Sequence, residues 1–278
     1  MSVAPCSGCG NSVDVALECP YCAAGADLQA PGDAAPAPAE PDRLVDETEV
    51  RLLDYRSTYN LGVVLQLMLA LYVAIAVWFV AASLPYLREL VDLRDSGAID
   101  DAGRFLAIES EFRWAAGSEG VALLLTGLVW IVWFYRSYRN LGSLGHRNAH
   151  AVWWAIFGWV IPLVSLYRPR QIAGELWVGS RPPDRTDLGA GLRAELEVPW
   201  YLNAWWGFFV VTNLALAVNR LSAFDPSFDS YVAVLRGEVG VVVAMALSAT
   251  VALLVVGSIN NGQAARARSL EAAVARRL

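Results

Sequence analysis

The sequence contains no lysine, so all 21 of its basic residues are arginines, and only 17% of its 278 residues are charged. Soluble domains ordinarily carry about 25% charged residues. Hydrophobic residues make up 56% of the chain, and the mean hydropathy is +0.42. These values exclude an ordinary soluble protein and favour a membrane protein. The net charge of −6, with arginines clustered only beside apolar runs, also excludes a nucleic-acid-binding surface.

Charged residues are missing altogether from three long stretches, at 57–87, 198–219 and 239–265. Each stretch exceeds the roughly 20 residues that cross the hydrocarbon core of a bilayer. A fourth apolar run crosses if Glu119 lies in the outer headgroup layer. The sequence therefore predicts an all-α membrane protein with four transmembrane helices, at about 61–84, 115–135, 198–219 and 239–259.

The N-terminus, MSVAPCSGCG, lacks the basic and apolar regions of a cleavable signal peptide. We therefore expect the first long apolar run to direct insertion itself and the preceding tail to be cytosolic. The expected location is the plasma membrane, with both termini in the cytoplasm.

Cysteine is scarce, and its four copies fall in two Cys-x-x-Cys pairs, Cys6 with Cys9 and Cys19 with Cys22. Two such turns brought together supply four thiolates, the ligand set of a structural zinc site. Two disulfides are the alternative, which requires an oxidising compartment. For a cytosolic tail we predict a small zinc-ribbon-like module over 1–23, with Zn as a structural cofactor.

Composition divides the rest of the chain into three parts. Residues 24–42 are rich in Ala, Pro and Gly and predict a disordered linker. Residues 43–270 form the predicted multi-pass membrane domain, and residues 271–278 form a basic tail. Residues 88–119 predict two short helices joined around Ser96 and Gly97 outside the cytoplasm, and Pro85 is expected to close the first span.

The stretch from Trp130 to Val178 contains six of the eleven tryptophans and five arginines. Within it, residues 151–167 are barely long enough to cross a membrane and include Pro162. If this segment crosses, there are five spans, with 8 arginines inside and 13 outside; if it dips in and returns, there are four spans, with 15 inside and 6 outside. The positive-inside rule favours the second topology, with 151–167 as a re-entrant or interfacial broken helix.

Four segments resemble a known family: WFYRSYRNLGSLG, WWAIFGWVIPLVSLYRPRQIAGELW, NAWWGFF and SINNGQAARAR. They are similar to the actinobacterial membrane family DUF4328, over roughly residues 50–270. The most specific parts are Arg136 to Asn140 and Trp154 to Trp177, with Pro162 and Pro169. The resemblance implies a multi-pass membrane protein and supplies no catalytic residue.

No Ser-His-Asp, Cys-His or paired-carboxylate arrangement falls in the membrane domain, so we expect no enzymatic activity. The first hypothesis is a non-enzymatic scaffold that presents the zinc module to a cytosolic or membrane protein partner. The alternative is binding or transport of a lipid or small molecule in a cleft at the re-entrant segment, although the cores of the spans lack the ionisable groups usual in transporters.

The lipid bilayer is the expected partner in either case, because arginines and tryptophans lie where apolar runs end. Plain anchoring in the membrane is the alternative role for these side chains. The candidate headgroup or cleft residues are Arg136, Arg139, Asn140, Trp154, Pro162, Arg168, Arg170 and Trp177.

Overall fold

The computed structural model describes residues 3–5, 12–14, 52–182 and 198–276, with side chains described from residue 52 onward. The chain divides into two compact units, 1–47 and 48–278. In the first unit, strand β1 (Val3–Pro5) pairs antiparallel with β2 (Ser12–Asp14). The four cysteines and the linker predicted at 24–42 lie outside the described residues, so the zinc ribbon stays a prediction.

Four helices in the second unit are long and apolar enough to cross a membrane: α3 (Tyr59–Ser96), α4 (Ala102–Ser143), α8 (Trp200–Ser222) and α9 (Phe228–Ala275). Three of them contain a predicted span, and α8 contains all of the predicted span 198–219 except its first two residues, so the prediction of an all-helical domain with four such helices is confirmed. Helix α9 has 48 residues and is therefore about 72 Å long. That length exceeds a hydrocarbon core of about 30 Å, so α9 extends well beyond any bilayer it crosses.

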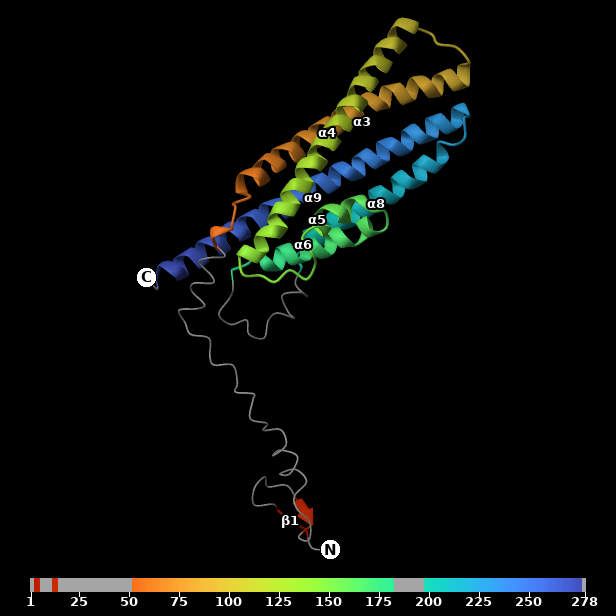
Figure 1. Cartoon of the computed structure of the whole chain (residues 1–278). Helices are drawn as coiled ribbons and strands as arrows, with labels where there is room; N and C mark the ends of the chain where they lie inside the picture. Colours follow the sequence, from red (N-terminus) through yellow and green to blue (C-terminus); the bar gives the residue numbers. More distant parts are fainter. Residues whose placement is uncertain (1–2, 6–11, 15–51, 183–197, 277–278) are drawn as a thin grey trace. The chain divides into compact units, whose positions relative to one another are not determined.

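The large helix interfaces join α3 to α4, α3 to α9, and α8 to α9. The four helices therefore follow one another in the order α4, α3, α9, α8 (Figure 1). Among the described residues, the backbones of the outer helices α4 and α8 stay apart, and the two helices meet through side chains such as Trp130 and Trp205. The space between them is partly occupied by shorter helices from the intervening segment.

Helix α3 passes through Pro85 and ends only at Ser96, where Gly97 adopts a left-handed backbone with φ of 72°. The helix therefore continues beyond Pro85, and the expectation that Pro85 closes the first membrane span stays a prediction. A proline removes one backbone hydrogen bond, but the apolar side chains on both sides of Pro85 keep packing. Tyr86 and Leu90 are buried in a small cluster with Val232 and Leu235 of α9. The region predicted as two short helices consists instead of continuations of α3 and α4.

The segment between α4 and α8 forms a helical hairpin (Figure 1). It comprises α5 (Trp154–Val160), the 3₁₀ turn η1 (Val164–Leu166) and α6 (Arg168–Gly179). The chain reverses after α5 at Pro162 and Leu163, and Leu163 has an unfavourable φ of 64° for a residue with a side chain. A Cβ at Gly158 would lie 3.2 Å from the Arg168 side chain, so glycine permits the close packing of α5 on α6.

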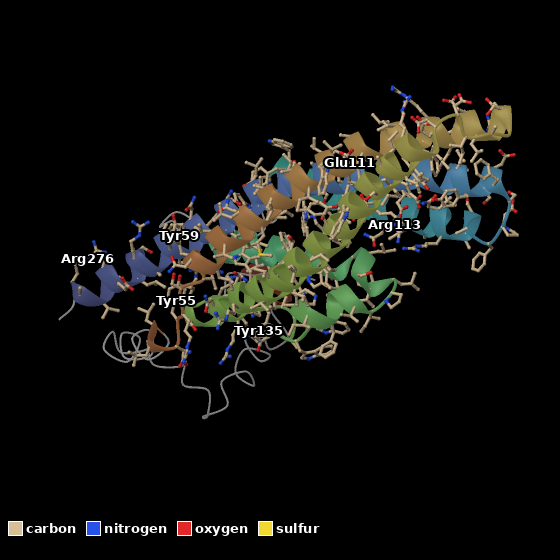
Figure 2. All side chains as sticks on the ribbon, turned by 90° about the horizontal axis from the view of Figure 1, so that it is seen from above. Tyr55, Tyr59, Glu111, Arg113, Tyr135 and Arg276 are labelled. Atoms are coloured by element: carbon tan, nitrogen blue, oxygen red, sulfur yellow. The ribbon has the colours of Figure 1, made fainter. Side chains whose placement is uncertain are left out.

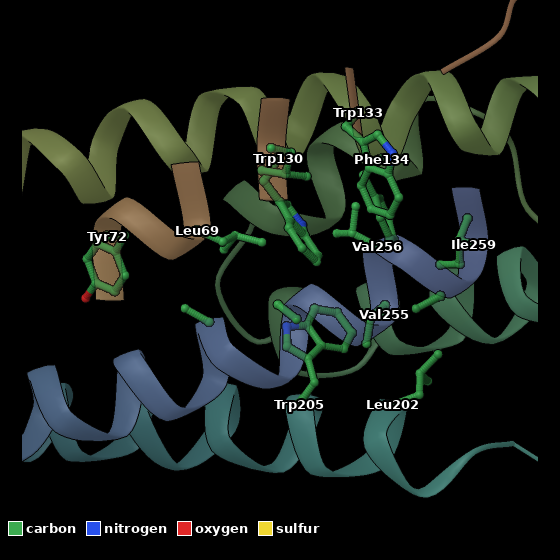
Figure 3. Close-up of a cluster of buried hydrophobic side chains, with 14 of the residues drawn as sticks. Leu69, Tyr72, Trp130, Trp133, Phe134, Leu202, Trp205, Val255, Val256 and Ile259 are labelled. Carbon is green, nitrogen blue, oxygen red and sulfur yellow. The ribbon is translucent and has the colours of Figure 1, made fainter. Parts of the chain in front are cut away.

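The core contains aromatic side chains from α3, α4 and α8, together with aliphatic side chains from α9 (Figure 3). Trp130 of α4 and Trp205 of α8 point toward each other, with ring centroids 5.4 Å apart. Many leucines and valines on the outer faces are exposed, including Leu67, Leu124 and Val218, each more than 60% exposed. Such a surface is typical of helices that face lipid.

Candidate functional site: a buried polar network and an arginine pocket

The start of α3, the C-terminal end of α4 and the second half of α9 meet in a buried polar network, which we call the Asn140 end. Gln263 is 1% exposed, and its Nε2 donates a hydrogen bond to the Ser137 carbonyl at 2.8 Å. The Thr58 hydroxyl donates to Gln263 Oε1 at 3.3 Å, and the Ser137 hydroxyl donates to Thr58 Oγ1 at 3.4 Å. Directional bonds therefore fix three helices in one register.

Asn260 extends this network one turn toward the core. Its Oδ1 accepts a hydrogen bond from Trp133 Nε1 at 3.0 Å, and the Trp133 side chain is fully buried. A Cβ at Gly62 of α3 would collide with the Asn260 amide. Glycine at position 62 is therefore required for α3 to approach α9 at this level.

Arg266 of α9 binds the ends of the helical hairpin to the bundle. Its guanidinium donates to the carbonyls of Leu144, Gly179 and Arg181, at 2.8, 3.0 and 3.0 Å. Leu144 caps α4, and Gly179 is the last residue of α6. One side chain therefore holds the chain where it leaves α4 and where it leaves α6.

Glu175 of α6 forms a second polar group at the hairpin. Its carboxylate accepts from the Tyr138 hydroxyl at 2.6 Å and from the Ala149 amide at 3.1 Å, and it pairs with His150 Nδ1. Asn148 Nδ2 also donates to the Tyr138 carbonyl at 3.2 Å. The chain segment that leads into the hairpin is therefore linked by hydrogen bonds to α6, the last helix of the hairpin.

A pocket of about 410 Å³ opens beside the polar network at the Asn140 end. Its lining residues come from the segment before α3 and from the last turns of α4: Asp54, Arg56, Tyr135, Arg136, Arg139 and Asn140. Asn140 Nδ2 donates to the Arg56 carbonyl at 2.7 Å, which holds the segment before α3 against α4. Asp54 and Arg139 also line an adjoining cavity of about 230 Å³.

The charges of this arginine pocket are strongly one-sided. Three guanidinium groups face a single carboxylate, so the lining carries a net charge of +2. Arg56, Arg136 and Arg139 are all exposed, whereas Asn140 is only 5% exposed. Guanidinium groups bind carboxylate and phosphate oxygens through paired hydrogen bonds, so the pocket has the composition of an anion site.

The eight residues predicted as one cleft fall into two groups. Arg136, Arg139 and Asn140 line the arginine pocket, whereas the other five lie on the helical hairpin. There, the Arg168 guanidinium lies 5.0 Å from the Trp154 ring centroid, and Arg170 donates to Asn203 of α8 at 2.6 Å. That all eight predicted residues belong to a single site stays a prediction.

The other two predicted residues of the hairpin, Trp177 and Pro162, lie in different surroundings. Trp177 packs edge-on against Tyr201, with centroids 5.9 Å apart, and lies 4.4 Å from the Arg181 guanidinium. Pro162 is exposed at the reversal between α5 and η1. Trp177 and Arg170 thus join α6 to the start of α8.

Sequence reasoning missed the residues that build the polar network. Glu175 lies between Ile172 and Leu176 on the apolar face of α6, and a carboxylate on such a face indicates a buried partner. Gln263 follows Ile259 and Asn260 at helical spacing and carries the same signal. Their partners lie 37 and 126 residues away, at Tyr138 and Ser137, which no local pattern predicts.

Within the described residues, no group of three or more His, Cys, Asp or Glu side chains is placed to hold a metal ion. The cysteines of the predicted zinc site lie outside that part of the chain.

Comparison with known proteins places part of the chain in a family. No curated protein and no solved structure matched the chain. Residues 107–261 match the family described as a domain of unknown function, DUF4328. The matched region contains most of α4, the helical hairpin, α8 and α9 as far as Asn261. Because the match covers more than half of the 278 residues, the chain belongs to the DUF4328 family.

Proposed function

We propose that this chain is a non-enzymatic, multi-pass protein of the plasma membrane that binds the phosphate of an anionic lipid in its arginine pocket. In this proposal α3, α4, α8 and α9 cross the bilayer. The hairpin of α5, η1 and α6 dips into the membrane and returns, and both termini are cytoplasmic. The arginine pocket then lies at the inner leaflet.

The contacts of the hairpin support this topology. The start of the hairpin contacts α4 through His150 and Tyr138, and its end contacts α4 and α9 through Arg266. Both ends of the hairpin therefore lie at the Asn140 end of the bundle. With this end in the cytoplasm, 15 of the 21 arginines are on the inner side, as the positive-inside rule requires.

The single observation that carries the binding proposal is the arginine pocket itself. Arg136 and Arg139 lie where the apolar part of α4 ends, directly after the buried residues Trp133 and Phe134, and Arg56 joins them from the segment before α3. A lipid phosphate occupies the same depth, at the boundary between hydrocarbon and water. Tyr135 adds an aromatic ring of the kind that is enriched at this boundary. Inner-leaflet anionic lipids attract such arginines electrostatically.

Lipid retention measured by native mass spectrometry tests the proposal. The full chain is purified from nanodiscs that contain phosphatidylglycerol and phosphatidylethanolamine. We expect the wild type to retain phosphatidylglycerol and the Arg136→Gln/Arg139→Gln variant to retain it about tenfold less, because each lost contact is a charged hydrogen bond. Arg236→Gln is the matched control, since Arg236 is exposed near the opposite ends of the helices.

Two outcomes of this experiment contradict the proposal. One is equal retention of phosphatidylglycerol by the wild type and the double variant. The other is a result in which millimolar inorganic phosphate displaces the bound lipid, and binding at the pocket does not fall when phosphatidylglycerol is replaced by another lipid. That result would identify a soluble anion as the ligand.

The cysteine spacing favours a second function, a scaffold that presents a zinc module to a protein partner. Strand β1 ends directly before Cys6, and β2 begins three residues after Cys9, so a short antiparallel pair flanks the first Cys-x-x-Cys sequence. This proposal requires one zinc ion per chain by elemental analysis. It also requires that Cys9→Ser abolish capture of the partner; an unchanged set of partners would contradict it.

A further inference from the structure

The arginine pocket has a smaller cavity beside it, which we call the adjoining cavity. The described residues that line it are Asp54, Arg139, Gly142 and Ser143, and its volume is about 230 Å³. Asp54 and Arg139 also line the arginine pocket of about 410 Å³. These two side chains therefore lie at the boundary between the two cavities.

The two cavities follow one another along α4. Tyr135 and Arg136 line only the arginine pocket, whereas Gly142 and Ser143 line only the adjoining cavity. From Arg136 to Ser143 the helix rises by about 10 Å. In the proposed topology the C-terminal end of α4 is cytoplasmic, so the adjoining cavity lies farther from the hydrocarbon than Arg136. The headgroup of a phospholipid extends from its phosphate in the same direction.

The lining of the adjoining cavity is polar and carries no net charge. Asp54 supplies hydrogen-bond acceptors, Arg139 supplies donors, and the Ser143 hydroxyl can do both. One carboxylate and one guanidinium cancel here, whereas three guanidinium groups face one carboxylate in the arginine pocket. The adjoining cavity therefore does not favour a second phosphate, and the Arg139 guanidinium repels an ammonium group. A neutral hydroxyl group, which both donates and accepts, matches this lining.

The two shared side chains are accessible to a ligand, since Asp54 and Arg139 are both exposed. The ion pairs among the described residues do not join Asp54 to an arginine of the pocket, so none of those guanidinium groups occupies its carboxylate. The segment that carries Asp54 is held against α4, because the buried Asn140 side chain donates to the Arg56 carbonyl at 2.7 Å. Asp54 is therefore kept beside the pocket with its carboxylate open.

We infer that Asp54 selects anionic lipids whose headgroup is a small polyol, such as glycerol or inositol, attached to the phosphate. The inference rests on the proposed binding of a lipid phosphate in the arginine pocket. With the phosphate on Arg136 and Arg139, the headgroup enters the adjoining cavity, and its hydroxyls donate to the Asp54 carboxylate. The cavity volume is below the range of about 300–1,000 Å³ that holds a drug-sized ligand, so the cavity takes a small headgroup rather than a second lipid.

Native mass spectrometry with two matched lipids tests the inference. Phosphatidylglycerol and phosphatidylethanol have the same phosphodiester and the same single negative charge, but only phosphatidylglycerol has hydroxyl groups on its headgroup. The full chain is placed in nanodiscs that contain equal amounts of both lipids with identical acyl chains. We expect the wild type to retain phosphatidylglycerol about fivefold more than phosphatidylethanol, as about 1 kcal/mol from one hydrogen bond implies.

Asp54→Ala removes the acceptor and leaves the arginines in place. We expect this variant to retain the two lipids equally, because only the hydroxyl contact distinguishes them, and to retain no less phosphatidylethanol than the wild type. Asp54 is exposed, so the variant is expected to fold. Asp100→Ala is the matched control, since Asp100 is exposed in the turn that precedes α4, and it should keep the fivefold preference.

Equal retention of both lipids by the wild type would overturn the inference. It would leave the proposed phosphate site intact if retention of both lipids still required Arg136 and Arg139. A preference that survives in Asp54→Ala would also overturn the inference. Displacement of phosphatidylglycerol by millimolar glycerol 3-phosphate, which has the same polyol phosphate without acyl chains, would assign the site to a soluble ester and overturn selection among lipids. Retention of neither lipid by the wild type would contradict the proposed function itself, and the inference with it.

Discussion

The two ends of the helical bundle are held together by different interactions. At the Asn140 end, buried side chains form directional hydrogen bonds between helices, and Gln263 and Ser137 are almost completely buried. The opposite end, which we call the Gly97 end, has a small apolar cluster around Tyr86 and surface ion pairs such as Arg104 with Glu89. Its hydrogen bonds between helices, Tyr86 with Tyr231 at 3.3 Å and Asn219 Nδ2 to the Val234 carbonyl at 3.0 Å, are only partly buried. Figure 2 shows Tyr55, Tyr59 and Arg276 toward the Asn140 end and Glu111 and Arg113 on the side of the Gly97 end.

This difference indicates where the molecule needs a fixed geometry. Buried hydrogen bonds specify one helix register, because a shift of one residue leaves polar groups without partners. Apolar contacts and exposed ion pairs tolerate small shifts at little cost. The end with the fully buried network is the one that contains the arginine pocket, and the Gly97 end contains none of the candidate site residues.

The largest effect is expected at Gly62. Gly62→Ala places a methyl group in the space of the Asn260 amide, so we expect a loss of about 3 kcal/mol in the free energy of unfolding. Unfolding in detergent micelles measures this loss. Gly120→Ala is the control, because nothing lies within 4 Å of a Cβ there. Similar effects of both substitutions would show that α3 and α9 are not in close contact.

Gln263→Leu is expected to have the next largest effect. It leaves the Ser137 carbonyl and the Thr58 hydroxyl without their Gln263 partner in a buried site, at a cost of about 2 kcal/mol. The same unfolding assay applies, with Asn261→Leu as the control, since Asn261 is exposed on the same helix. A loss no larger than that of the control would mean that the network does not stabilise the Asn140 end.

Glu175→Gln is expected to loosen the hairpin rather than the bundle. The substitution keeps the shape of the side chain but removes the charge that faces His150 and Tyr138, at a cost of about 1 kcal/mol. Hydrogen exchange should therefore accelerate in residues 149–179 and stay unchanged in α3. Glu111→Gln is the control at an exposed position. Faster exchange throughout the bundle would contradict a local role.

Acid is expected to weaken the Asn140 end through His146. Burial, together with the nearby Arg266 guanidinium, lowers the pKa of His146 from its ordinary value of 6.5. A histidine with a lowered pKa in the folded state favours the neutral form. Its contribution to stability is therefore complete above pH 6.5 and is lost as the pH falls through the lower, folded-state pKa.

The His146→Gln variant isolates this contribution. Unfolding midpoints of the wild type and the variant, measured between pH 8 and pH 5 at about one-unit intervals, should show a steeper decline for the wild type below pH 6.5. Parallel curves would show that protonation of His146 does not oppose folding.

The smallest effect is expected at the Gly97 end. Arg104→Gln breaks the ion pair with Glu89, but the Arg104 side chain is 69% exposed, so the free energy of unfolding should change by no more than about 0.5 kcal/mol. A loss as large as that of Gln263→Leu would remove the contrast between the two ends.

The helices were predictable from the sequence because charge-free runs and their length depend only on local composition. The break at Pro162 was predictable for the same reason. The extension of α3 through Pro85 was not, because the apolar cluster formed by Tyr86 and Leu90 with Val232 and Leu235 depends on contacts between distant segments. The arginine pocket was half predictable: Arg136 and Arg139 follow an apolar run, whereas Asp54 and Arg56 join them only through tertiary packing.

The position of the C-terminus tests the proposed topology most directly. A reporter enzyme or fluorescent protein fused after Leu278 marks the side of the membrane on which α9 ends. Four crossings and a returning hairpin predict a cytoplasmic reporter, on the same side as the arginine pocket. An external reporter would mean that residues 151–167 cross the membrane, and it would contradict the proposed topology.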